Sequence, residues 1–500
     1  MTGDESLARW LPDRAALTPD RIAIDFGGRI ISYHELRDAA FARAAAFLQT
    51  GLKPGDRVAT LTRNCPEHVA VFFACAMSGL VLVPVNWRLT AAELAYQLTD
   101  ADPALLLAEP SLEVLAKEAA GPAYTVESLQ SPPSVSDAAA TLMPSRNVSG
   151  GDPLLILYTS GTTGRPKGAV LSHANCFWTN LSLDRTAAIT GGDVVLQVLP
   201  QCHVGGWNVQ PLLAWWQGAT VVLEQSFDAG RVLELIAGKK VTTMMGVPTN
   251  YQLLAAHPDF ETADLSSLRQ VIVGGAPMPR PLLETWQARG VTVLQGYGLT
   301  EAAPNVLCIP SEYATAKTGS AGRPYLHVSV ALRNLEGDGL VEGPGTGELL
   351  VRGPNVFTGY WRNPAATTAA LAPGWLATGD IAERDADGFY WIRGRSKDMY
   401  ISGGENVYPA EVEEALLAHE ALAEAAVVGV PDQRWGETGL AFVVYRPGTE
   451  VSPEELTAHC RERLARYKVP SRFRIVAALP RLTSGKLDKV TLRSMLEETT

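Results

Sequence analysis

The chain has 500 residues, of which 46% are hydrophobic, and its formal net charge is −11 at pH 7. This length is too great for one hydrophobic core, so we expect at least two domains. The acidic balance argues against a general nucleic-acid binder, because such proteins are normally basic.

The N-terminal part of the chain carries features that argue against a signal peptide and a membrane span. Its first 14 residues are rich in charge and lack a hydrophobic core segment. The longest apolar stretch, VFFACAMSGLVLVPV at 71–85, is broken by Ser78, Gly79 and Pro84. It is shorter than the roughly 20 residues that a membrane-spanning helix needs. We expect a buried helix that ends near Gly79, followed by a buried strand.

The six cysteines show no CxxC spacing and no accompanying histidine cluster. This argues against a structural zinc site and against a disulfide framework. Reduced thiols are typical of cytoplasmic proteins, so we expect a cytoplasmic protein without integral membrane contact. A weak peripheral contact with a membrane and assembly into a homodimer both stay open.

Strand and helix patterns alternate through the first three fifths of the chain. Strands that are apolar on both faces and separated by helices indicate mostly parallel sheets covered by helices. The Pro-, Ser- and Gly-rich segment 121–152 is predicted to be a surface connection between two subdomains. The predicted strands are 57–61, 80–85, 104–109, 193–200, 219–224, 270–275 and 291–298, and the clearest helices are 91–101 and 229–239.

The pattern changes after about residue 340. Segments 347–353 and 388–395 predict antiparallel hairpins and a small β-barrel-like part. A compact α+β unit follows, in which Ser452 is the expected N-cap of the helix 452–465. We therefore expect an α/β fold with a large N-terminal domain of stacked mixed and parallel sheets flanked by helices, and a small α+β C-terminal domain. The predicted boundaries are 1–395 and 396–500.

The loop YTSGTTGRPKG at 158–168 is the first candidate for a binding site. Its glycines allow backbone N–H groups to converge on an anion, and its hydroxyls and Lys167 add further donors. Phosphate is therefore the natural ligand, although the spacing differs from the Walker pattern. Taken alone, the loop could equally be a flexible surface turn.

Further motifs follow the loop in a fixed order. Two of them lie at the carboxyl ends of predicted strands, where open α/β sheets bind ligands. The motifs are VGGAPMP (273–279), QGYGLTEAAP (295–304), WLATGD (375–380), IRGRSKDMYISGGENVYPAEVE (392–413) and PRLTSGKLDK (480–489). Together with the loop they resemble the adenylate-forming superfamily of acyl-CoA synthetases, adenylation domains and luciferases. The resemblance covers nearly the whole chain, from ISYHEL at 31–36 to Lys486.

The resemblance implies a site for ATP and Mg²⁺. The loop would hold the β- and γ-phosphates, Thr300 would donate to the α-phosphate, and Glu301 would bind Mg²⁺. Tyr297 would stack on adenine, Asp380 would accept from the ribose hydroxyls, and Arg395 would reach the ribose or the phosphates. The expected nucleotide-binding set is Thr159, Ser160, Gly161, Thr162, Thr163, Gly164, Lys167, Gly275, Ala276, Pro277, Gly296, Tyr297, Gly298, Asp380 and Arg395.

The resemblance also implies two half-reactions, separated by a swing of the C-terminal domain. Lys486 would bridge the substrate carboxylate and the α-phosphate, and Lys397 would be the hinge. Ser402, Gly403 and Gly404 would then border the tunnel for the pantetheine of coenzyme A. Residues 461–493 hold ten Lys or Arg and two acids, which suits the phosphates of coenzyme A, although most of these charges would be an ordinary solvated face.

The acyl end of the site is less specific. His203 aligns with a histidine near the reacting carboxylate, and Trp207 lies where some fatty-acyl relatives place a gate, although core packing is an equal alternative. Small and apolar walls are expected from Met245, Gly246, Val247 and Ala302. The segment HVGGW stands where amino-acid-activating relatives carry an aspartate, which argues against a peptide-synthetase module.

These features predict an ATP-dependent, AMP-forming acyl-CoA ligase, an acid–thiol ligase whose substrates are a carboxylic acid and coenzyme A. A medium- or long-chain fatty acid is the leading acid, and an aryl acid such as a hydroxycinnamate, ferulate or succinylbenzoate is the alternative. A luciferase-like monooxygenase and a non-catalytic nucleotide-binding scaffold are more distant alternatives. The joint presence of Lys486, Glu301 and Asp380 argues against the scaffold.

Overall fold

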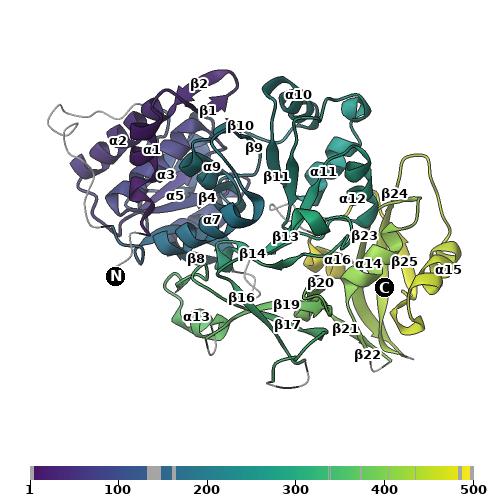
Figure 1. Cartoon of the computed structure of the whole chain (residues 1–500). Helices are drawn as coiled ribbons and strands as arrows, with labels where there is room; N and C mark the ends of the chain where they lie inside the picture. The colour runs from purple at the N-terminus through teal and green to yellow at the C-terminus, as the bar shows by residue number, and fades with distance from the viewer. Residues whose placement is uncertain are drawn as a thin grey trace.

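The computed structural model describes residues 5–131, 148–159, 165–335, 337, 339–371, 374–403, 405–433, 435–481 and 487–495. Within these ranges the strands form four sheets. In Figure 1 helices α2, α3 and α5 lie at the left, strands β9, β11 and β13 near the centre, and the yellow-green C-terminal sheet at the right. The predicted α/β class, with a large N-terminal part and a small C-terminal part, is confirmed.

Two large mixed sheets make up most of the N-terminal part of the molecule. The larger runs in the order β15 (Arg323–Pro324), β14 (Asn305–Cys308), β13 (Val293–Gly298), β12 (Gln270–Val273), β11 (Thr243–Gly246), β9 (Val194–Gln197), β10 (Thr220–Leu223), β1 (Ile22–Phe26) and β2 (Arg29–Ser32). The smaller runs in the order β18 (Gly359–Tyr360), β8 (Lys167–Ser172), β7 (Pro153–Thr159), β4 (Val81–Val85), β3 (Arg57–Leu61), β5 (Leu105–Ala108) and β6 (Val126–Ser128).

Two antiparallel sheets follow. The first, β16 (Ser329–Arg333), β17 (Gly345–Arg352), β19 (Leu376–Arg384) and β20 (Tyr390–Arg395), takes the place of the predicted β-barrel-like part. The C-terminal sheet contains β22 (Glu405–Val407), β21 (Tyr400–Ser402), β24 (Gly436–Tyr445) and β23 (Leu422–Asp432), with β25 (Arg472–Ile475) parallel to β24. The proposed domain boundary at residues 395 and 396 falls between β20 and the short helix η6 (Ser396–Asp398).

Helices lie between most of the strands. They are α1 (Trp10–Leu17), α2 (Tyr33–Gln49), α3 (Pro66–Ser78), α4 (Ala91–Ala101), α5 (Glu113–Ala120), α7 (His173–Ala187), α8 (Gly205–Asn208), α9 (Pro211–Gln217), α10 (Ala229–Lys239), α11 (Pro248–Ala255), α12 (Arg280–Ala288), α13 (Pro364–Ala370), α14 (Pro409–Leu417), α15 (Pro453–Arg463) and α16 (Lys489–Ser494). Across the described residues, no helix combines the length and apolar character that a bilayer crossing requires.

Several local predictions are confirmed. The apolar helix α3 begins with Pro66 at its first turn and ends at Gly79, whose φ of 69° lets it cap the helix in the left-handed conformation. Helix α15 has the expected capping box between Ser452 and Glu455. All six cysteines are buried free thiols. The prediction of parallel sheets was incomplete, because strands such as β2, β8 and β14 join their neighbours in antiparallel pairs.

The predicted surface connection 121–152 contains β6, a strand that the sequence pattern did not reveal, and its residues 132–147 lie outside the described ranges.

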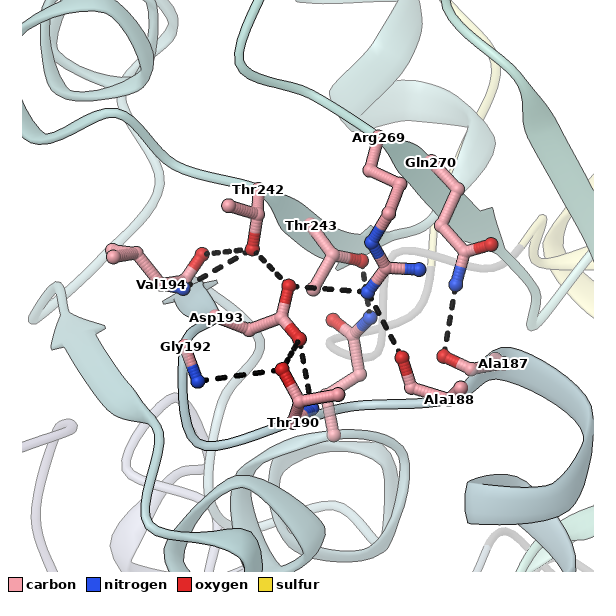
Figure 2. Close-up of polar contacts among 11 residues, drawn as sticks. Ala187, Ala188, Thr190, Gly192, Asp193, Val194, Thr242, Thr243, Arg269 and Gln270 are labelled. Atoms are coloured by element: carbon pink, nitrogen blue, oxygen red, sulfur yellow. Dashed lines mark hydrogen bonds and ion pairs between the residues drawn. The ribbon is translucent and has the colours of Figure 1, made fainter.

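A polar cluster ties together the amino ends of three parallel strands (Figure 2). Asp193, Thr242 and Arg269 each directly precede a strand, β9, β11 and β12. The Asp193 carboxylate accepts from the Thr242 hydroxyl at 2.7 Å, from the Arg269 guanidinium at 3.1 Å and from the Thr190 N–H at 2.7 Å. Burial alone would raise the pKa of Asp193, but these hydrogen bonds together lower it. The cluster thus fixes the sheet at the end opposite to the predicted binding motifs.

Candidate active site

Three predicted nucleotide-binding residues meet at the carboxyl end of β13. The Tyr297 hydroxyl donates to Asp380 Oδ2 at 2.5 Å, and Arg395 Nε lies 2.7 Å from Asp380 Oδ1. Asp380 and Arg395 face each other across the β19–β20 pair, and Arg395 also donates to the Thr378 carbonyl at 3.1 Å. Residues far apart in the sequence therefore form one polar group, built on three regular strands.

The electrostatics of this group suit the part of a ligand that is polar but carries no charge. Burial, followed by the negative charge of Asp380, raises the pKa of Tyr297 well above its usual value, so its phenol stays protonated and donates. The Asp380 side chain is only 7% exposed and is held by a phenol and a guanidinium. A buried carboxylate in this setting is a strong acceptor for the hydroxyls of a sugar.

Two glycines of the expected nucleotide set are required by the local backbone, one by a close contact and one by its φ angle. A Cβ on Gly298 would lie 2.0 Å from the Pro304 carbonyl oxygen, which no side chain can tolerate. Gly275 has a φ of +82°, in the left-handed region, and a Cβ there would lie 3.3 Å from the Val247 side chain. Gly296, Ala276 and Pro277 lie beside them at the same edge of the large sheet.

A second polar group surrounds Glu301, in the short helix η4 (Thr300–Ala302). Its carboxylate accepts from the Tyr360 hydroxyl at 2.7 Å and from the Thr159 hydroxyl at 3.5 Å. The Lys167 ammonium lies 5.3 Å from the centre of the Tyr360 ring, a cation–π contact. The structure therefore brings together Thr159, Lys167 and Glu301, three of the residues expected at the site.

Tyr360 is a site residue that the sequence analysis missed. It lies in β18, which pairs with β8 next to the phosphate loop. Burial and then the charge of Glu301 raise the pKa of Tyr360, so it remains a donor to that carboxylate. The segment GYWRNP, an aromatic pair between a glycine and the first turn of a helix, was the available signal.

The donor set around Glu301 fits a magnesium ion that arrives with phosphates. Among the described residues there is no group of three or more His, Cys, Asp or Glu side chains that could hold a metal by themselves. Mg²⁺ in nucleotide sites commonly takes one or two carboxylates and completes its octahedron with phosphate oxygens and water. A single carboxylate beside a lysine and a threonine matches that pattern.

Some predicted residues cannot be placed. Ser160, Gly161, Thr162, Thr163, Gly164, Gly404 and Lys486 lie outside the described residues. The two ends of the phosphate loop are described, however, because Thr159 of β7 pairs with Lys167 of β8. The loop is thus the connection of an antiparallel hairpin, not of a strand and a helix.

The predicted acyl end is apolar and tightly packed. Trp207 is 0% exposed, stacks on Phe72 with ring centres 4.7 Å apart, and donates from Nε1 to the Gln201 carbonyl at 2.6 Å. His203 is half-buried in the turn before α8. The packing alternative for Trp207 therefore has direct support, and the gate role stays a prediction.

The other expected pocket residues lie at strand ends near the nucleotide groups. Met245 and Gly246 end β11, Val247 follows them, and Ala302 is fully buried in η4. A Cβ on Gly246 would lie 2.9 Å from the Tyr251 ring, so a larger residue would force that ring to move. These walls carry no charge and are shaped by close contacts.

The hinge candidate and the expected coenzyme A segment lie in neighbouring elements. Lys397 is exposed in η6, and Asp398 beside it forms an ion pair with Arg493 at 3.1 Å. Ser402 is buried, and Gly403 has a φ of +63°. A Cβ on Gly403 would lie 2.6 Å from the Trp435 ring, so this position requires glycine in the described arrangement.

The basic segment 461–493 is largely a surface with ion pairs, as expected. Five of its cations pair with acids of the C-terminal part: Arg463 with Glu462, Lys468 with Glu411, Arg481 with Glu424, Lys489 with Glu413 and Arg493 with Asp398. Pairs of this kind on a surface contribute little to stability. They also leave fewer cations to attract an anionic ligand.

Comparison with known proteins agrees with this arrangement. Residues 11–361 match the family model described as AMP-binding enzyme, and residues 411–486 match that of the AMP-binding enzyme C-terminal domain. A feruloyl-CoA synthase of an Amycolatopsis species is 41% identical over 98% of this chain and 99% of its own length. An indoleacetate–CoA ligase of Aromatoleum aromaticum is 38% identical over 99% of both chains. The structure of an O-succinylbenzoate coenzyme A synthetase from Bacillus subtilis, solved with ATP and a magnesium ion, superimposes with a TM-score of 0.86 at 34% identity, covering 97% of this chain and 99% of that one.

Proposed function

This chain belongs to the AMP-binding enzyme family, and from that premise we propose that it is an AMP-forming CoA ligase for an aromatic carboxylic acid. It is an acid–thiol ligase that uses ATP, Mg²⁺ and coenzyme A. The class of carboxylic acid that it activates is the more specific part of the proposal.

One observation carries the choice of acid. The feruloyl-CoA synthase is 41% identical over 98% of this chain, and the indoleacetate–CoA ligase is 38% identical over 99% of it. Both are named for acids that contain an aromatic ring. The comparisons therefore support the aryl-acid alternative better than the medium- or long-chain fatty acid that the sequence analysis placed first.

The packing of Trp207 supports the same choice. A tunnel for a long acyl chain gated by this residue would need the indole to move aside. The indole is fully buried, stacked on Phe72 and hydrogen-bonded to the Gln201 carbonyl. Displacing it would break these contacts, whereas an acid without a long chain does not require this displacement.

The first half-reaction joins the acid to AMP. A carboxylate oxygen attacks the α-phosphorus of ATP, the bond to the β-phosphate oxygen breaks, and pyrophosphate leaves with that electron pair. Tyr297, Asp380 and Arg395 hold the nucleoside, and Thr159 and Lys167 hold the outer phosphates. Thr300 and Lys486 donate to the α-phosphate as its negative charge grows. Mg²⁺, when held by Glu301, neutralises part of the triphosphate charge.

The second half-reaction transfers the acyl group. The thiol of coenzyme A attacks the acyl carbon, the mixed anhydride bond breaks, and AMP leaves while the thiol proton goes to solvent or to a nearby base. In this proposal His203 acts near the reacting carboxylate. Lys397 acts as the hinge of a movement of the C-terminal domain. In this movement Lys486 leaves the site and the segment Ser402–Gly404 enters it, so that pantetheine can bind along this segment.

The proposal is tested by measuring pyrophosphate release and thioester formation across a panel of acids, with ATP, Mg²⁺ and coenzyme A present. Hydroxycinnamic, indoleacetic and substituted benzoic acids should give the highest kcat/KM, with octanoic and palmitic acids as the comparison. A higher kcat/KM for the fatty acids would overturn the aryl assignment. Silence on every acid would favour the scaffold alternative.

A further inference from the structure

The second half of α4 contacts strand β7 and the residue that precedes β8, on the two sides of the predicted phosphate loop. The Tyr158 hydroxyl of β7 donates to Asp100 Oδ2 at 2.6 Å, and the Gln97 carbonyl lies 3.1 Å from it. On the other side of the loop, the Tyr96 hydroxyl donates to the Pro166 carbonyl at 3.2 Å. Helix α4 therefore holds the hairpin one residue before Thr159 and one residue before Lys167.

Strand geometry makes this contact relevant to the site. Successive side chains of a strand point to opposite faces, so Tyr158 and Thr159 face in opposite directions. Tyr158 reaches Asp100 on α4, and Thr159 reaches Glu301 at 3.5 Å. A shift of Tyr158 relative to α4 would therefore move the Thr159 hydroxyl relative to Glu301.

The same turn of α4 holds a second segment of the site. The Trp361 indole donates from Nε1 to the Asp100 carbonyl at 3.0 Å. Tyr360, the preceding residue, donates to Glu301 at 2.7 Å. Asp100 thus contacts Tyr158 through its carboxylate and Trp361 through its carbonyl. These two residues adjoin Thr159 and Tyr360, which both hydrogen-bond to Glu301.

Charged neighbours fix Trp361 against this end of the helix. The guanidinium groups of Arg57 and Arg362 lie 5.4 Å and 5.5 Å from the centre of the indole ring. Both arginines also form ion pairs with Asp102, at 3.4 Å and 3.1 Å. Asp102 itself caps α4 in the left-handed conformation. The contacts of the indole are therefore tied to the end of α4.

Helix α4 is a rigid support for these contacts. Its N-terminus has a complete capping box between Thr90 and Glu93, and its apolar face buries Leu94 and Leu98 in a core cluster. Burial and then the charge of Asp100 raise the pKa of Tyr158, so the phenol stays protonated at any physiological pH.

We propose that Asp100 and Tyr158 are positioning residues for the triphosphate end of the nucleotide site. They act through Thr159, Lys167 and Tyr360, which they hold in register around Glu301. The inference rests on the proposed function, because it assigns these residues to the grip on ATP. It adds two residues that the expected nucleotide-binding set did not contain and predicts that they affect the outer phosphates selectively.

Titration calorimetry with Mg·ATP and with AMP tests the inference without any acid substrate. Tyr158→Phe should raise the Kd for Mg·ATP by a factor of about 5 to 20, because a hydrogen bond to a charged group is lost. The Kd for AMP should stay within a factor of about two, because AMP lacks the outer phosphates and depends on the Tyr297–Asp380 group. Tyr33→Phe is the matched control: it removes a buried phenol that donates to the Ala219 carbonyl at 2.6 Å, away from the site, and should change neither Kd.

Variants of the helix residue separate positioning from folding. Asp100→Asn keeps an acceptor for Tyr158 and should retain most of the Mg·ATP affinity, whereas Asp100→Ala should match Tyr158→Phe. The double variant Tyr158→Phe/Asp100→Ala should be no weaker than either single one, since both remove the same contact. An unchanged Mg·ATP affinity in Tyr158→Phe, or an equal loss for AMP, would overturn the inference. A wild-type chain that binds AMP but not Mg·ATP would instead contradict the proposed triphosphate site itself.

Discussion

The nucleotide end and the acyl end of the site are built in different ways. At the nucleotide end, polar side chains from separate elements meet in short hydrogen bonds, as in Tyr297–Asp380 at 2.5 Å and Tyr360–Glu301 at 2.7 Å. At the acyl end, Trp207 and Ala302 are 0% exposed and the expected walls are apolar. The nucleotide end requires particular functional groups, whereas the acyl end requires a shape.

This difference explains how evolution can change one end without the other. A carboxylate that binds ribose hydroxyls has few substitutes, because its charge and geometry are both used. A wall of methyl and methylene groups can be rebuilt by many residues of similar volume. Variants should therefore separate into those that affect ATP regardless of the acid and those that affect the acid regardless of ATP.

The largest effect is expected from Lys486→Ala, at the nucleotide end. It should raise the barrier to pyrophosphate release by about 4 to 6 kcal/mol, since a cation that stabilises the growing phosphoryl charge is lost. Thioester formation from supplied acyl-adenylate should change little. Rapid-quench assays of the two half-reactions measure this, with Lys489→Ala as the control. Equal losses in both halves would show that the two steps do not use separate domain positions.

The next largest effect is expected from Trp207→Ala, at the acyl end. Removing this fully buried indole should lower the free energy of unfolding by about 3 to 5 kcal/mol. The KM for ATP should stay near that of the wild type, while the preference among acids should shift. Trp286→Ala is the matched control, because that indole is also 0% exposed but lies in another core cluster. An acid preference unchanged in Trp207→Ala would assign Trp207 to packing alone.

Asp380→Ala tests the nucleotide end again, at a smaller scale. The KM for ATP should rise by a factor of about 100, or about 2.7 kcal/mol, because the ribose loses its acceptor and Arg395 loses its partner. The increase should be the same with every acid. Asp193→Ala removes a buried carboxylate with four hydrogen-bond donors at the opposite end of the strands, and should reduce stability while leaving the KM for ATP unchanged. A rise in the KM for ATP that differs from one acid to another would contradict the independence of the nucleotide end and the acyl end.

The smallest effect is a pH dependence near Trp207. Burial lowers the pKa of His68 to about 3, and its ring lies 5.0 Å from the Trp207 ring. Below about pH 6.5 the unfolded chain binds a proton at this position and the folded chain does not, so stability falls as the pH falls from about 6.5 to 3. Between pH 7 and pH 5 this histidine should lower the free energy of unfolding by about 2 kcal/mol.

Thermal unfolding measures this contribution. The midpoint of His68→Gln should fall less between pH 7 and pH 5 than that of the wild type. His34→Gln, at an exposed histidine that pairs with Asp38, serves as the control and should behave as the wild type does. The same pH dependence in all three chains would show that His68 does not titrate as its burial requires.

The nucleotide end could be predicted from the sequence because its motifs specify chemistry. The resemblance of these motifs to the adenylate-forming superfamily implied Gly298, Thr159, Glu301 and Asp380 before any geometry was known. Gly298 shows why such signals are strong, since a Cβ would lie 2.0 Å from a carbonyl oxygen. The helices 91–101 and 229–239 were predicted with their observed bounds because their apolar periodicity is clear.

Other features depend on contacts that local patterns do not encode. Tyr360 joins the site because β18 pairs with β8, a strand far away in the sequence. Asp100 joins it through the end of a helix whose own pattern is that of an ordinary amphipathic surface helix. The antiparallel strands β2, β8 and β14 were not separated from parallel ones, because an apolar run does not reveal the direction of its neighbour. The sequence could not rank a fatty acid against an aryl acid, because apolar walls fit a ring and a chain equally well.

The late strand β18 has a consequence for synthesis of the chain. Gly359 pairs with Val170 and Tyr360 with Ala169, so the edge strand β8 has no outer partner until residue 360 has left the ribosome. An unpaired apolar edge is a template for association with other chains. We expect nascent chains that end before Gly359 to need chaperone protection, and the same two residues that complete the sheet then deliver Tyr360 to Glu301. The pairing of β18 with β8 thus completes the smaller sheet and positions Tyr360 beside Glu301 at the same time.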